Sequence, residues 1–479
     1  MDDLPIEVIE RIVSFLPDTG LSSFATISSK WQHPVERRTF SCLTITSREA
    51  DKYTELKALE QYVFSPSRAY RRKYLREIHF RVCFPRLQTN QAHSYVCRTS
   101  WRHIQQLFRI LALGDHLDAT NEGRTGGRKG ITLDLGLICI PESGSHLGFI
   151  FGNGVVLGNG REQLSQVKCI SRLIQPCHIF ARVFDRNYRT QWVQSLVPET
   201  AIHLVKSLPC LRYLVIDDNH NAFTFLRGPR HFINRDHFIR DLSNANYLSN
   251  HQGVATSTPL KVYLNFRPTD NFGGASTDIM SPTLRMWSHN VASFDVSGAF
   301  DRSLFWPQES EPTRMLTLPE SPWPWLRSFH VKLLNETPSG DPYFATSNAS
   351  RSQNVPVKDK VQPLFESWAK ALAAMPIIEQ ATVRWSLTFD TPEANSKRDW
   401  LVGFQAPGTT LRLNRHAWEH NVTADMRMRP RLVFQNDHGW RPDHMTMKQL
   451  HKMGEEKFPM NTMIEVDVDH LGNVTQLQT

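Results

Sequence analysis

Several groups of glycine, cysteine and histidine residues are of the types that bind phosphates or metal ions. None of them has the spacing of a known phosphate-binding or metal-binding motif. The glycine-rich run over 152–160, GNGVVLGNG, reads GxGxxxG, and no helix pattern follows it to present an amino terminus to a phosphate. We interpret it as a turn region. Cys177, His178, His231 and His237 match no zinc-ligand spacing. No P-loop, GxSxG, HExxH or kinase signature occurs either. We therefore predict that the chain is not an enzyme and binds no cofactor or metal.

A basic segment over residues 51–110 is a second candidate site. It holds 12 Lys and Arg against 4 Asp and Glu, a local charge of +8, whereas residues 1–50 sum to −2. Its densest run comprises Arg68, Arg71, Arg72, Lys73 and Arg76. Arginine clusters bind phosphoproteins and other acidic ligands, and basic patches bind nucleic acid; a solvated face is the plainer interpretation. Because no nucleic-acid module is recognisable, we expect no nucleic-acid partner.

Three short helices are predicted before this segment. Pro5 is typical of a first helical turn, apolar residues follow at helical spacing from Ile9 to Leu16, and the sequence over 17–20 stops the helix. Further helical spacing runs over 21–27 and 31–35. About forty residues are too few for a robust independent core. Periodicity alone allows either a helical cap on the following domain or a docking surface.

The same segment resembles the F-box. The resemblance covers residues 2–45 and rests on the LP start at Leu4-Pro5, IVSFLP over 12–17, ISSKW over 27–31, and Phe40. It implies a three-helix F-box over 1–46 that binds the Skp1 adaptor and, through it, the cullin and RING subunits of an SCF ubiquitin ligase. The chain would then be the substrate-recognition subunit, which presents an unidentified protein for ubiquitination. The alternative is a nucleic-acid- or phosphoprotein-binding protein that uses the basic segment.

The resemblance also implies which residues contact Skp1. The alternative for some of them, Trp31 above all, is that they hold the three helices together and do not contact Skp1. The implied contact residues are Leu4, Pro5, Ile9, Ile12, Leu21, Phe24, Ile27 and Trp31.

Helix-like and strand-like runs alternate through the rest of the chain, which indicates an α/β architecture. Several strands have the form L-x-x-[LIF]-x-[VIF], and their centres are separated by gaps of 31 to 81 residues. A regular leucine-rich repeat has a period of about 20–29 residues. We therefore predict an irregular leucine-rich-repeat-like solenoid with long loops over 47–479, less readable from about 406. This arrangement resembles large F-box proteins of filamentous fungi; an unrelated mixed α/β domain is the alternative.

Composition favours an intracellular protein with no membrane association. Hydrophobic residues make up 40% of the 479, which is enough for a core, and the seven cysteines include no CxxC pair. No run approaches the roughly 20 apolar residues that cross a bilayer. We expect a cytoplasmic or nuclear location, or both.

Overall fold

The structure is a computed structural model, and it describes part of the chain. The described residues are 4–17, 20–48, 53–84, 92–119, 130–139, 164–175, 192–194, 204–205, 207–218, 260–266, 278, 280–309, 311, 322–346, 354–388, 397–410, 421–436, 439–469 and 473–477. The chain divides into two compact units: unit 1 is Met1–Phe238 with Gly253–Thr256, and unit 2 is Ile239–Gln252 with Ser257–Thr479. The sequence alone did not indicate this division of residues 47–479.

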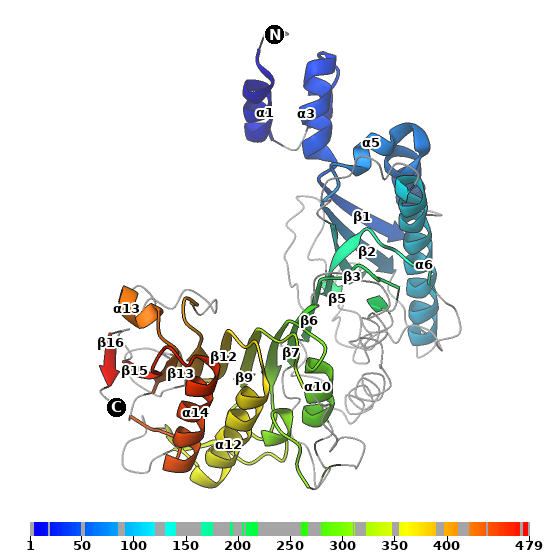
Figure 1. The fold of residues 1–479 in the computed structure, drawn as a ribbon. Coiled ribbons are helices and arrows are strands. Elements are labelled where there is room, and N and C mark those ends of the chain that lie inside the picture. Colours follow the sequence, from blue (N-terminus) through cyan, green and yellow to red (C-terminus); the bar gives the residue numbers. More distant parts are fainter. Residues whose placement is uncertain are drawn as a thin grey trace. The chain divides into compact units, whose positions relative to one another are not determined.

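Unit 1 begins with two helices joined by a single helical turn. Helices α1 (Ile6–Phe15) and α3 (Ser29–Thr39) lie side by side (Figure 1), and the four-residue α2 (Leu21–Phe24) connects them. Their shared interior is small. It consists of Ile9, Val13, Leu21, Trp31 and Val35.

The predicted three-helix bundle over 1–46 is wrong, because the middle segment forms only one turn. After α2 the backbone makes i to i+3 hydrogen bonds, from the Thr26 amide to the Ser23 carbonyl and from the Ile27 amide to the Phe24 carbonyl. The Thr26 hydroxyl also donates to the Ser23 carbonyl at 2.8 Å. Hydroxyl side chains that bond the local backbone compete with helix formation. The apolar spacing over 21–27 was therefore no sign of a full helix.

A mostly parallel sheet forms the body of unit 1. Its order is β1-β2-β3-β4-β6, all paired in parallel, and β5 pairs antiparallel with β3. The strands are β1 (Cys42–Arg48), β2 (Glu77–Phe84), β3 (Ile131–Cys139), β4 (Ile170–Gln175), β5 (Trp192–Gln194) and β6 (Tyr213–Asp218). The helical segments are α4 (Thr54–Leu59), η1 (Glu60–Phe64), η2 (Pro66–Arg68), α5 (Ala69–Arg72) and α6 (Ala92–Ala119).

Alternation along β2 separates an apolar face from a polar one. Ile78, Phe80 and Val82 are buried, and α6 runs alongside the strands (Figure 1). Because side chains alternate in a strand, Glu77, His79 and Arg81 lie on the opposite face. That face carries the polar cluster described below.

The strands of unit 2 are also mostly parallel, but the last of them reverse direction. Strands β7, β8, β9 and β12 are parallel, β13 is antiparallel to both β12 and β14, β15 is parallel to β14, and β16 is antiparallel to β15. They are β7 (Lys261–Phe266), β8 (Ser293–Gly298), β9 (Ser328–Leu333), β12 (Gln380–Thr388), β13 (Lys397–Gln405), β14 (Arg431–Gln435), β15 (Ile464–Val468) and β16 (Val474–Leu477). A separate hairpin pairs β10 (Phe344–Thr346) with β11 (Asn354–Pro356).

Helices α10 (Met280–Ser288), α12 (Lys358–Ala374) and α14 (His444–Lys457) lie along this sheet (Figure 1), and two shorter segments are η5 (Arg302–Leu304) and α13 (Ala424–Arg427). Aromatic rings fill the space beneath α12. Phe365 on the helix lies 6.2 Å from Trp385 of β12, and Trp385 lies 5.1 Å from Trp400 of β13, measured between ring centroids. These aromatic rings thus form part of the interior of unit 2.

The α/β architecture is confirmed, but the leucine-rich-repeat-like solenoid is wrong. A solenoid repeats one unit in one direction, so its strands stay parallel. Here β12, β13 and β14 alternate in direction, and β16 reverses on β15. None of the described helices combines the length and apolar content that spanning a bilayer requires.

Candidate functional site

Helix α1 carries two apolar stripes, and the part of the chain that the structure describes covers only one of them. The inner stripe, Ile9 and Val13, packs against α3. Val8, Ile12 and Phe15 follow the spacing i, i+4, i+7 on another face, and we call them the outer stripe. Their exposed fractions are 41%, 37% and 78%. A surface helix normally has one apolar face, so a second one marks a place where another apolar surface can bind.

The structure divides the eight implied Skp1 contacts into three groups. Pro5, Ile12 and Ile27 are exposed, whereas Leu4 and Phe24 are half-buried. Ile9, Leu21 and Trp31 form the interior between the helices and are buried. The resemblance did not single out Val8 and Phe15, although their spacing from Ile12 could have identified them.

An ion pair joins α3 to the remainder of unit 1. The Arg71 Nη2 of α5 lies 2.6 Å from the Glu36 Oε1 of α3, and Gln32 and Tyr70 donate to the same oxygen at 3.0 and 3.4 Å. The Arg71 guanidinium also lies over the Phe40 ring, 4.7 Å from its centroid. Burial disfavours the Glu36 carboxylate, but the hydrogen bonds from Arg71, Gln32 and Tyr70 outweigh it and lower the pKa of Glu36. We call Glu36 and Arg71 the clamp.

The five predicted basic residues do not form one free surface. Arg71 is in the clamp, and Arg72 is buried, with its guanidinium donating to the Gly114 carbonyl at 3.4 Å. Arg68, Lys73 and Arg76 are exposed. Two of the five basic residues thus make internal bonds, which weakens the case for an acidic-ligand or nucleic-acid site here.

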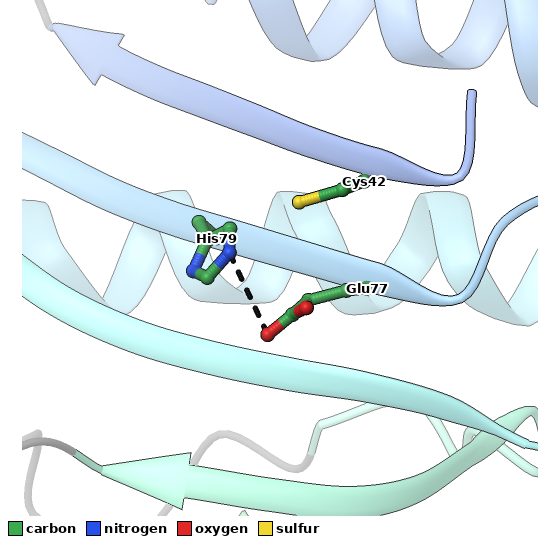
Figure 2. A group of neighbouring side chains, drawn as sticks. All are labelled: Cys42, Glu77 and His79. Carbon is green, nitrogen blue, oxygen red and sulfur yellow. Dashed lines mark ion pairs between the residues drawn. The ribbon is translucent and has the colours of Figure 1, made fainter. Parts of the chain in front are cut away.

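A polar cluster lies where β1 and β2 begin. Cys42, Glu77 and His79 each direct a ligand-type atom into one space, and these atoms lie within 4.8 Å of one another (Figure 2). The His79 Nε2 lies 3.5 Å from the Glu77 Oε1, and its Nδ1 lies 2.7 Å from the Asp134 Oδ2 of β3. Asp134 is in turn held by Arg81 at 2.6 and 3.0 Å.

The charges in this cluster depend on one another. The hydrogen bond to Asp134 raises the pKa of His79. Burial opposes the charge on Asp134, but the bonds from His79 and Arg81 prevail and lower its pKa. Partial burial, then the nearby charges of Glu77 and Asp134, raise the pKa of the Cys42 thiol. Sequence reasoning missed the cluster because Cys42 meets Glu77 only through the register of β1 and β2.

Unit 2 has a polar row across three neighbouring strands. Asp295, His330 and Thr382 are neighbours across β8, β9 and β12. The His330 Nδ1 lies 2.9 Å from the Thr382 hydroxyl, and its Nε2 lies 2.7 Å from the Ser328 hydroxyl. Burial lowers the pKa of His330 to about 3 and raises that of Asp295 to about 6. Since no hydrogen bond joins Asp295 to His330 among the described contacts, the row does not form an acid–base pair there.

The remaining sequence candidates lie outside the described residues. These are the glycine-rich run over 152–160 and Cys177, His178, His231 and His237.

No protein-family model matches the chain, and a search of curated proteins finds no match either.

Proposed function

We propose that the amino-terminal helices dock on an adaptor of the Skp1 type and that the chain is a non-catalytic substrate-recognition subunit of an SCF-type ubiquitin ligase. The observation that carries the proposal is the outer stripe of α1. Val8, Ile12 and Phe15 are large apolar side chains left in water, and fully burying one such side chain contributes about 1.5–3 kcal/mol. Residues at i, i+4 and i+7 are the usual anchors of a helix that lies in an apolar groove.

The similarity of residues 2–45 to the F-box supports the choice of partner. The exposed Ile27, which follows α2, belongs to the same segment and to the implied contact set. The α/β region that follows the amino-terminal helices would supply the substrate-binding part. Catalysis would then be largely a matter of proximity, because holding a protein near a charged conjugating enzyme raises its effective concentration without chemistry by this chain.

Substituting Phe15 by aspartate tests the docking surface. A charge placed in the outer stripe has to be desolvated when a partner covers it, so we expect Phe15→Asp to weaken binding to purified Skp1 at least about tenfold, or about 1.4 kcal/mol. Calorimetry with the full-length chain measures the dissociation constant. Ile12→Asp, on the same stripe, should weaken binding in the same direction.

The matched control is Ser14→Asp. Ser14 is exposed on α1 and precedes Phe15, but it lies outside the stripe, since successive helical residues are about 100° apart. We expect the affinity of the Ser14→Asp variant for Skp1 to stay within about threefold of the affinity of the unsubstituted chain, a change below about 1 kcal/mol in binding free energy. Equal weakening by Ser14→Asp and Phe15→Asp would contradict the outer stripe as the interface. An unsubstituted chain that fails to bind Skp1 would contradict the proposed function itself.

A further inference from the structure

The polar cluster of unit 1 has the arrangement of a metal site. The parallel register sets Cys42 of β1 directly opposite Glu77 of β2. The two-residue period of a strand brings His79 to the same face as Glu77. Figure 2 shows the three side chains directed toward one another, and their sulfur, oxygen and nitrogen atoms lie within 4.8 Å of one another. A small adjustment of side-chain torsions would bring all three to one ion.

Asp134 gives the histidine the orientation that a ligand needs. Its carboxylate accepts from the His79 Nδ1 at 2.7 Å, which leaves Nε2 facing Glu77 and the Cys42 side of the cluster. Metal-binding histidines almost always donate their other ring nitrogen to a carboxylate or carbonyl in this way. Arg81 holds Asp134 with two bonds, so the orienting group is itself fixed.

An alternative explanation is a protonated His79 that bridges two carboxylates without a metal. Such an ion pair explains why Glu77, His79 and Asp134 lie together, but it does not explain why the sulfur of Cys42 lies beside them. A thiol, an imidazole and a carboxylate together form a borderline-soft donor set that suits Zn²⁺ better than Mg²⁺ or Ca²⁺.

We propose that Cys42, Glu77 and His79 bind one Zn²⁺ ion, with Asp134 as a positioning residue that orients His79. The ion takes the place of the Cys42 thiol proton and, where His79 is protonated, of the proton on its Nε2; each displaced proton passes to solvent. Three protein ligands leave the fourth tetrahedral position for water or for a group on a bound molecule. Access is open, because Cys42 is exposed and the side chains of Glu77 and His79 are 38% and 30% exposed.

Zinc binding would fasten the start of β1 to β2. Only Phe40 and Ser41 separate Cys42 from the end of α3, so the ion would lie directly behind the amino-terminal helices. The inference does not depend on the proposed function, since it uses residues outside the outer stripe.

The test uses the full-length chain after removal of metal with a chelator. Zn²⁺ is titrated by calorimetry, and Co²⁺ serves as the spectroscopic probe, because a cobalt–thiolate bond produces a near-ultraviolet charge-transfer band. We expect one Zn²⁺ per chain at this site and a charge-transfer band with Co²⁺. Cys42→Ser should abolish the band. His79→Gln and Glu77→Gln should each weaken Zn²⁺ binding at least about tenfold, because losing even a residue that only hydrogen-bonds a metal ligand weakens metal binding by about that much.

Cys210→Ser is the matched control. It makes the same atomic change at a half-buried free cysteine of unit 1, and it should leave both the band and the affinity unchanged. Circular dichroism checks that each variant is folded, and Glu77→Gln provides a variant that preserves side-chain size. The proposal is overturned if the unsubstituted chain gives no charge-transfer band, or if Cys42→Ser binds Zn²⁺ as tightly as Cys210→Ser.

Discussion

Replacing Arg285 by methionine should lower the free energy of unfolding of unit 2 by about 3–5 kcal/mol, the range for breaking a buried ion pair. Arg285 lies on α10, its side chain is fully buried, and its two terminal nitrogens lie 3.0 and 2.7 Å from the two carboxylate oxygens of Glu311. One of them also donates to the Ser303 carbonyl of η5. Methionine fills much of the space but leaves the Glu311 carboxylate buried without its counter-charge.

Chemical denaturation followed by tryptophan fluorescence measures this loss, since Trp287 lies on the same helix. The matched control is Arg327→Met. Arg327 pairs with Glu379 at 2.5 Å, but their side chains are 58% and 42% exposed. Exposed pairs contribute about 0–1 kcal/mol, so the control should change stability by no more than that.

A double variant separates the missing ion pair from general damage. In Arg285→Met/Glu311→Gln the buried charge is gone, so we expect the double variant to be more stable than Arg285→Met alone. If Arg285→Met costs no more than Arg327→Met, or if removing the Glu311 charge recovers nothing, the ion pair does not have the role assigned to it.

The strands were predictable because their signal is local. Alternating apolar residues over 75–82 indicated a strand observed as β2, and the run over 377–389 corresponds to β12. Helix-like spacing over 364–375 likewise corresponds to the later part of α12 and its C-cap residue, Met375. Each pattern reports which side chains face an apolar interior, and this is settled within a few residues.

Strand direction and long-range partners were not predictable in this way. The antiparallel pairing of β13 with both neighbours depends on how the chain returns after β12, and no residue within the strand specifies that. Cys42 and Glu77 are 35 positions apart in the sequence and become neighbours only through the register of β1 and β2. Arg285 is one of 55 Lys and Arg residues, and no local pattern indicates that it pairs with Glu311. The charge run over 68–76 has the same limit: the density of charge in the sequence does not show that Arg71 and Arg72 bond internally.

The clamp links the helices that carry the proposed docking surface to the remainder of unit 1. Arg71→Met should destabilise the amino-terminal helices relative to the sheet by about 3 kcal/mol, the lower end for a broken buried pair, because Gln32 and Tyr70 still donate to Glu36. Hydrogen exchange of the α1 and α3 amides measures it. Protection should fall there and stay unchanged in β2 and β3.

Acid sensitivity gives the clamp a second readout with a defined sign. The pKa of Glu36 is lowered by folding, so its stabilisation is complete above the unfolded value of about 4.3 and is lost as the pH falls through the folded value. Without Arg71 this acid-dependent loss should shrink. Arg37→Met removes a pair with Glu10 at 2.9 Å that is 61% and 40% exposed, and it should change neither readout by more than about 0.5 kcal/mol. Equal effects of Arg37→Met and Arg71→Met would mean that α3 is held to unit 1 by packing and chain connection, and that the clamp adds nothing to the presentation of the outer stripe.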